Sequence, residues 1–214
     1  RQSDGWIRTH GNYPHHAMRL QAGLGLTADA DADDVRTAIL PLSVTEAVER
    51  ITLARGLAVP VLQENPERDA RLRATPLLQV ERIDLAPRPG RHGTDGRHSL
   101  APLTGVRVLD LTRVIAGPVC TRTLALLGAD VLRVDPPDLV EPEWQHLDTG
   151  QGKRTTLLEA RTDRFEELLA AADVVVLGYR PESLDRLGLS ASALLERHPA
   201  PVSYTHLRAH ETRG

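Results

Sequence analysis

Few residues in this sequence could do chemistry by themselves, and each has a plain structural alternative. His15 and His16 are adjacent, but neighbouring histidines point in different directions and no third metal ligand is evident, so we expect no metal site. Cys120 is the only cysteine, which excludes an internal disulfide. It lies in an apolar helical stretch beside Thr121, and this setting favours a packed thiol over a nucleophile. Asp110 stands near the end of an apolar strand pattern, where it could be catalytic or structural.

Some segments could bind an anionic ligand instead. The loop at 113–118 leads directly into a helical pattern, and backbone N–H groups at a helix start can face a phosphate. The glycine fingerprint of dinucleotide-binding loops is missing, so spacing alone favours a structural turn. Arg180 and Arg186 could bind phosphate through their guanidinium groups, or they could simply face solvent near a helix start.

The elements that must position these residues alternate regularly between strand and helix. This alternation predicts βαβ units and a parallel, Rossmann-like sheet, and therefore an α/β fold. In such sheets ligands bind at the carboxyl ends of the strands. The core must be aliphatic, because Phe165 is the only phenylalanine. We expect strands at 106–112, 130–134, 155–158 and 174–177, and helices at 118–127, 164–172, 182–187 and 191–197.

The chain is expected to have four segments. A small α+β domain occupies 1–84, a linker rich in Gly, Pro and Arg occupies 85–101, and the α/β domain occupies 102–202. Residues 203–214 show no periodic pattern and resemble translated adapter sequence, so we expect a non-native tail.

The small domain carries its own helix signals. Pro41 is expected to divide the helical pattern at 31–54 into two helices. Ser43 and Glu46 form a capping box for the second helix, and Gly56 is expected to close it at the C′ position.

Composition narrows the class of partner. The 214 residues carry a net charge of −3, without the positive excess that nucleic-acid binding requires. No apolar stretch approaches the roughly 18 residues of a membrane span, and no signal-peptide pattern is present, so we expect a cytoplasmic protein. Lys153 is the only lysine, so arginines must supply nearly all other cationic contacts. The sequence begins at Arg1 without Met, which suggests that it begins inside a longer protein.

A set of motifs in fixed order resembles the opening of family III CoA-transferases, a group that includes formyl-CoA, carnitine-CoA and bile-acid-CoA transferases and α-methylacyl-CoA racemases. The segment 4–16 also resembles the small-domain entry of long, two-part members. The motifs are Pro102–Thr112 (PLTGVRVLDLT), Ala116–Pro118 (AGP), Leu127–Val131 (LGADV), Gly152–Thr155 (GKRT), Ala172–Val176 (ADVVV) and Tyr179–Gly188 (YRPESLDRLG).

The resemblance implies that this chain binds coenzyme A as substrate and product, without a metal. It also implies a structural, hydrogen-bonding role for Asp110. Two positions depart from the family pattern, since Gly178 stands where an asparagine is frequent and Pro136 where a basic residue is frequent. The implied CoA contacts are Ile115 and Ala116 in the first loop, Leu158, Glu159, Ala160 and Arg161 beside the adenine, Gly178, Tyr179 and Arg180 in a later loop, and Arg186 at a phosphate.

The family mechanism implies an aspartate nucleophile, which attacks the acyl-CoA thioester to form a covalent intermediate. That aspartate lies downstream of the residues matched here, so we assign no catalytic residue and expect an inactive fragment with a truncated α/β domain. The implied partners are acyl-CoA and carboxylic acids, with interlocked dimers in intact members, and no nucleic acid or membrane. The alternatives are a non-catalytic module that binds CoA or a nucleotide, an acyl-CoA racemase of the same family, and a mis-assembled reading frame without independent function.

Overall fold

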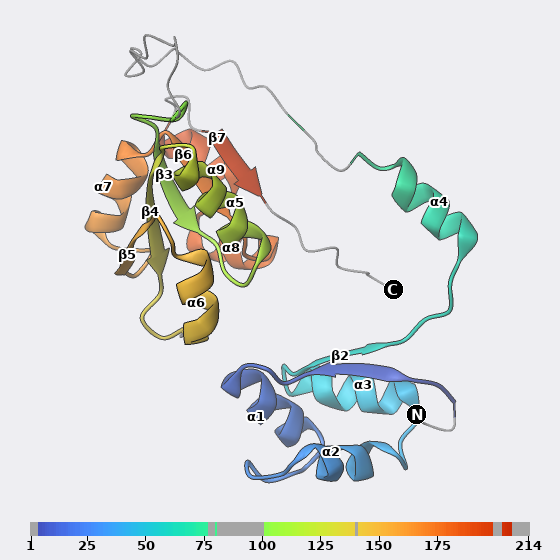
Figure 1. Cartoon of the computed structure of the whole chain (residues 1–214). Helices are drawn as coiled ribbons and strands as arrows, with labels where there is room; N and C mark the ends of the chain where they lie inside the picture. The colour runs from blue at the N-terminus through green and yellow to red at the C-terminus, as the bar shows by residue number, and fades with distance from the viewer. Residues whose placement is uncertain (1–3, 77–79, 81–100, 140, 199–202, 207–214) are drawn as a thin grey trace. The chain divides into compact units, whose positions relative to one another are not determined.

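The computed structural model describes residues 4–76, 80, 101–139, 141–198 and 203–206. The chain divides into two compact units, Arg1–Val80 and Glu81–Gly214, each of which has its own secondary structure (Figure 1). Only residue 101 of the linker expected at 85–101 lies among the described residues, so the prediction of an exposed linker falls outside them.

The first unit is a small α+β unit, as predicted. Its core joins Leu20, Ile51 and Ala58, which come from two helices and one strand. Its elements are strands β1 (Ile7–His10) and β2 (Leu57–Pro60), which pair antiparallel, and helices α1 (Pro14–Gly23), α2 (Ala32–Ile39), α3 (Val44–Leu53) and α4 (Pro66–Ala74).

Local sequence signals explain most of these helix ends. The break expected at Pro41 falls between α2 and α3, and the capping box of Ser43 and Glu46 is present. The end of α3 differs from the prediction, because the left-handed residue after the helix is Arg55 (φ 60°) and not Gly56. Gly56 is needed for a different reason, since a Cβ atom there would lie 2.7 Å from Ile51 Cγ2.

The second unit contains a five-stranded sheet with the order β5-β4-β3-β6-β7, in which every neighbouring pair is parallel. The predicted α/β fold with a parallel sheet is therefore confirmed. Its elements are β3 (Arg107–Leu111), α5 (Ala116–Leu126), β4 (Asp130–Asp135), α6 (Glu143–Thr149), β5 (Arg154–Leu157), α7 (Asp163–Ala171), β6 (Val174–Leu177), α8 (Pro181–Leu187), α9 (Ala191–Arg197) and β7 (Ser203–His206).

The two faces of this sheet bury different residues, because successive side chains of a strand point to opposite sides. On one face Val108, Val131 and Val176 pack with Leu124 of α5. On the other face the strands pack against α7, α8 and α9, and Phe165 is part of that larger cluster. Figure 1 shows α5 and α7 on opposite sides of the sheet, which gives three layers.

Three local predictions differ from the structure. Helix α5 begins at Ala116, two residues before the predicted start at Pro118. Helix α6 was not predicted. Strand β7 falls in the segment expected to be a tail, where it pairs with β6 at the edge of the sheet. Whether residues 203–214 are native to this protein stays a prediction.

Candidate functional site

The order of the strands creates the candidate site. The chain leaves β3 through α5 to reach β4 on one side, and later places β6 on the other side of β3. The loops that follow β3 and β6 therefore leave adjacent strand ends in different directions, and ligands of open α/β sheets bind at such a point. These two loops and the first residue of α5 contain half of the residues predicted to contact CoA, which are Ile115, Ala116, Gly178, Tyr179 and Arg180.

Two glycines allow the loops to approach each other around Thr112. A Cβ atom on Gly117 would lie 2.3 to 2.5 Å from three side-chain atoms of Thr112, a separation that real side chains do not adopt. A Cβ atom on Gly178 would lie 3.2 Å from Thr112 Cβ. Glycine at both positions thus lets the start of α5 and the end of β6 close on the end of β3.

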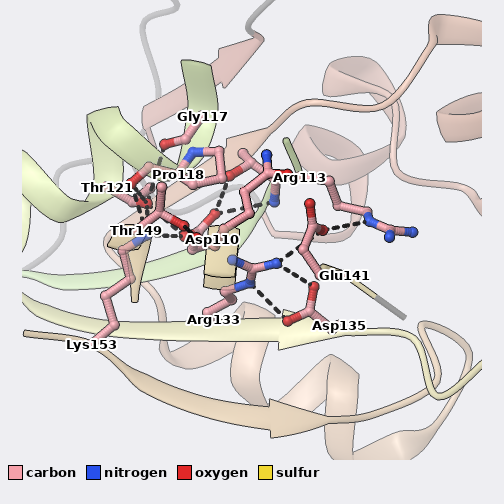
Figure 2. A network of polar contacts seen from close by, with 12 residues as sticks. Asp110, Arg113, Gly117, Pro118, Thr121, Arg133, Asp135, Glu141, Thr149 and Lys153 are labelled. Atoms are coloured by element: carbon pink, nitrogen blue, oxygen red, sulfur yellow. Dashed lines mark hydrogen bonds and ion pairs between the residues drawn. The ribbon is translucent and has the colours of Figure 1, made fainter. Parts of the chain in front are cut away.

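Behind this edge lies a buried ion pair. Lys153 Nζ donates to Asp110 Oδ2 (2.9 Å), to Thr121 Oγ1 (2.6 Å) and to the carbonyl oxygen of Pro118 (2.9 Å). The same carboxylate also accepts hydrogen bonds from the hydroxyls of Thr112 and Thr121 and from the backbone N–H of Thr112. The side chains of Asp110 and Lys153 are fully buried, so this cluster ties β3, the first turns of α5 and the segment before β5 together (Figure 2).

The cluster pairs a buried cation with a buried carboxylate. Burial lowers the pKa of Lys153 below its ordinary value, and the charge of Asp110 opposes this effect. The exposed fraction of Asp110 is zero, and its carboxylate forms hydrogen bonds with Thr112, Thr121 and Lys153, which fits the structural role that the family resemblance implies. Burial, with a smaller contribution from Asp110, raises the pKa of the Cys120 thiol, which is the opposite of an activated nucleophile.

A second buried cluster lies at the ends of β3 and β4. Arg133 forms a bidentate salt bridge with Asp135, with Nε–Oδ2 and Nη2–Oδ1 distances of 2.7 and 2.9 Å. Arg133 Nη2 also donates to Glu141 Oε2 at 3.2 Å, and Arg113 Nε donates to the same oxygen at 2.9 Å. Glu141 Oε1 accepts the backbone N–H of Val114 at 3.1 Å. One carboxylate thus links the end of β4 to the loop that follows β3.

The structure places the ten residues predicted to contact CoA in three groups. In the first group, Ile115 is the N-cap of α5 with 60% of its surface exposed, and Ala116 is the first residue of that helix. In the second group, Tyr179 packs against the larger core cluster, and burial raises its pKa to about 12. Gly178 precedes Tyr179, and Arg180 is the N-cap of α8.

The third group follows β5 and the end of α8. Leu158 and Ala160 pack against the larger core cluster, and Glu159 lies between them with its carbonyl oxygen accepting from Thr162. Arg161 Nη2 donates to the backbone oxygen of Arg186, so these two arginines lie together. Arg186 Nη2 also donates to Ser183 Oγ at 3.1 Å.

The sequence analysis expected a hydrogen-bonding role for Asp110 but did not predict its pairing with Lys153, and it missed the second cluster. Lys153 was noted only as a member of a motif and as the single lysine, and this rarity was the available signal. Nothing in the sequence marked Arg133, Asp135 or Glu141, because their pairing depends on the fold. Within the described residues, no group of three or more His, Cys, Asp or Glu side chains could hold a metal ion.

Comparison with known proteins shows the class to which the chain belongs. The model of CoA-transferase family III matches residues 103–214, which is just over half of the chain, so the chain belongs to this family. The acetyl-coenzyme A transferase nodX of Hypoxylon pulicicidum is 44% identical over 91 residues, which are 41% of this chain and 15% of that protein.

Other relatives match at lower identity. The formyl-CoA:oxalate CoA-transferase of Afipia carboxidovorans is 34% identical over 113 residues, covering 45% of this chain and 27% of that protein. The succinyl-CoA:glutarate CoA-transferase of Mus musculus is 34% identical over 140 residues, covering 53% of this chain and 32% of that protein. The crystal structure of Rv3272 from M. tuberculosis aligns with a TM-score of 0.46 at 31% identity, over 53% of this chain and 36% of that one. The chain thus spans a third or less of the length of these curated relatives.

None of the described helices is long and apolar enough to cross a membrane.

Proposed function

We propose that the second unit binds the CoA moiety of an acyl-CoA at the carboxyl ends of β3 and β6. The whole protein of which this chain is part then transfers CoA between carboxylic acids. The observation that carries the proposal is the convergence of the loops after β3 and β6 at the switch point of the sheet, in a chain of this family. Names of relatives that specify CoA donors and acceptors support the same class of reaction.

The proposed contacts fit the chemistry of CoA. Its phosphates carry several negative charges, and guanidinium groups bind phosphate through paired hydrogen bonds. Arg161, Arg180 and Arg186 supply the positive charge that binds these phosphates. Ile115 and Ala116 lie at the N-terminus of α5 and contact the rest of the cofactor. We extend the proposal to Leu158, Glu159 and Ala160 at the adenine and to Gly178 and Tyr179 in the loop that follows β6.

We further propose that this chain does not complete the reaction by itself. In the proposed mechanism an aspartate carboxylate attacks the thioester carbonyl, the C–S bond breaks, and CoA leaves as a thiolate, so that a mixed anhydride of the acyl group and the aspartate remains. The thiolate then attacks the aspartyl carbonyl of that anhydride, which forms an enzyme thioester and releases the donor acid as a carboxylate. No aspartate here occupies the motif position of that nucleophile. We also propose that the whole protein is cytoplasmic and forms interlocked dimers.

Calorimetric titration of the purified chain with CoA tests the binding site. We expect weak, salt-dependent binding, because arginines open to solvent are screened. Arg180→Ala is expected to weaken binding about tenfold, the loss typical of one charge-assisted hydrogen bond. Arg164→Ala is the matched control, since Arg164 is exposed on α7 and pairs with Glu167. Equal losses in both variants would place the CoA site elsewhere.

Incubation with a radiolabelled acyl-CoA and several carboxylates tests the second proposal. We expect no acyl exchange above the buffer control. Exchange that disappears in Arg180→Ala would show that the active site lies within this chain.

A further inference from the structure

The loop after β3 contains a residue in an unfavourable backbone conformation. Val114 has φ +69°, in the left-handed region that glycine adopts easily and that β-branched residues adopt rarely. Its side chain is 47% exposed, so burial of that side chain does not impose the conformation. Some other contact must hold the backbone there.

Glu141 supplies that contact. Its Oε1 accepts the N–H of Val114 at 3.1 Å, and its Oε2 accepts Arg113 Nε at 2.9 Å, so one carboxylate holds two consecutive residues of the loop. The side chain of Glu141 is only 5% exposed, so the carboxylate itself has little contact with water.

Glu141 is itself fixed by the sheet. Arg133, which is fully buried on β4, donates to Glu141 Oε2 at 3.2 Å and is held in place by both oxygens of Asp135. Figure 2 shows this line of contacts from β4 through Arg133 and Glu141 to the loop. These contacts connect the loop to a buried side chain of β4.

We infer that Glu141 is a positioning residue that holds Val114 in its left-handed conformation and so directs Ile115 and Ala116 toward CoA. The inference rests on the proposed CoA site. The backbone angle at Val114 sets the direction in which the chain continues to Ile115, the N-cap of α5, and to Ala116, the first residue of that helix. Without the carboxylate, Val114 relaxes to negative φ and these residues move from their binding positions.

Glycine at position 114 provides the decisive test, because it adopts positive φ without a carboxylate to hold it. We expect Glu141→Ala to weaken CoA binding at least tenfold in calorimetric titration. The double variant Glu141→Ala/Val114→Gly should recover most of that loss, measured against Val114→Gly alone. Asp148→Ala is the matched control for removal of an acid, since Asp148 is exposed and pairs with Arg122. A double variant that binds as weakly as Glu141→Ala would overturn the inference.

Amide hydrogen exchange of Val114, followed by NMR in 15N-labelled protein, gives a reading that does not require CoA. Exchange at Val114 should accelerate in Glu141→Ala while amides of β3 and β6 stay protected. If wild-type protein binds no CoA, the proposed function fails, whereas unchanged Val114 exchange in the variant contradicts the role of Glu141.

A conservative variant covers the case in which Glu141→Ala does not fold. Glu141→Gln keeps an oxygen for the Val114 N–H but loses the charge that Arg113 and Arg133 require. We expect an intermediate loss of CoA affinity and intermediate Val114 exchange. Values equal to wild type in both measurements would overturn the inference.

Discussion

At the residue scale, Lys153 and Asp110 form an ion pair in which both side chains are fully buried. Removal of one partner leaves the other charge buried and uncompensated, which typically costs about 3–5 kcal/mol. We therefore expect Lys153→Met to lower the free energy of unfolding in urea by about that amount. In an Asp110→Asn background the same substitution should cost much less, because no buried carboxylate is left unpaired.

Arg154→Met is the control for this cycle, because Arg154 forms an exposed pair with Asp130 and such pairs contribute about 0–1 kcal/mol. Strictly additive losses in the Lys153 and Asp110 variants would contradict the pairing. The motifs contained both residues, but 43 positions separate them in the chain. Their contact depends on the register of β3 with β4 and of β4 with β5, which no local pattern specifies.

Tyr179 gives a prediction of pH dependence. Burial raises its pKa to about 12, so the folded protein favours the neutral phenol. The neutral phenol contributes fully to the free energy of unfolding below a pH of about 10, the ordinary pKa of tyrosine. This contribution is lost as the pH rises toward the higher pKa of Tyr179 in the folded protein. The tyrosinate absorbance of Tyr179 is the difference between the absorbance of the wild type and that of Tyr179→Phe. We expect this difference to titrate near pH 12 while the protein stays folded. Titration of this absorbance near 10 would place the phenol in solvent.

At the element scale, the parallel sheet was predictable because its central strands β3, β4 and β6 are rich in aliphatic residues and alternate with helical segments, whereas α6 was not predictable. The buried residues of α6 are Gln145 and Thr149, while Trp144 and Leu147 are exposed, so the helix lacks the apolar periodicity that identifies amphipathic helices. The start of α5 was misplaced because proline usually opens helices. Pro118 is the third residue of α5, still in the first turn, where its missing N–H leaves no intrahelical hydrogen bond unmade.

The close approach of α5 to β3 can be tested at Gly117. A Cβ atom there would overlap Thr112, so we expect Gly117→Ala to destabilise the second unit by about 1–3 kcal/mol through overpacking. Thr112→Ser removes the Cγ2 methyl and should recover part of that loss in the double variant. Gly11→Ala is the control, because its nearest contacts of 3.7 and 3.8 Å are ordinary. The stability of each variant is measured by urea unfolding, and a Gly117→Ala variant as stable as wild type would contradict the approach.

At the scale of the whole molecule, the division into two units carries the last prediction. The core of the first unit contains Leu20, Ile51 and Ala58 around a two-stranded sheet, and isolated sheets of this kind are marginally stable in water. The second unit buries two larger clusters on the faces of a five-stranded sheet. None of these clusters combines described residues from both units, so we expect the units to open independently, the first at lower free energy.

Hydrogen exchange read by mass spectrometry measures the two units in one experiment. Peptides covering α3 should exchange through an opening of lower free energy than peptides covering β3 and β6, and mild urea should increase exchange in the first unit alone. Ile51→Ala is expected to accelerate exchange throughout the first unit, because it leaves a cavity at a fully buried position, while the second unit stays unchanged. Equal opening free energies in all peptides, shifted together by Ile51→Ala, would mean that the chain unfolds as one cooperative body. Different opening free energies would instead mean that each unit is stabilised by its own hydrophobic core.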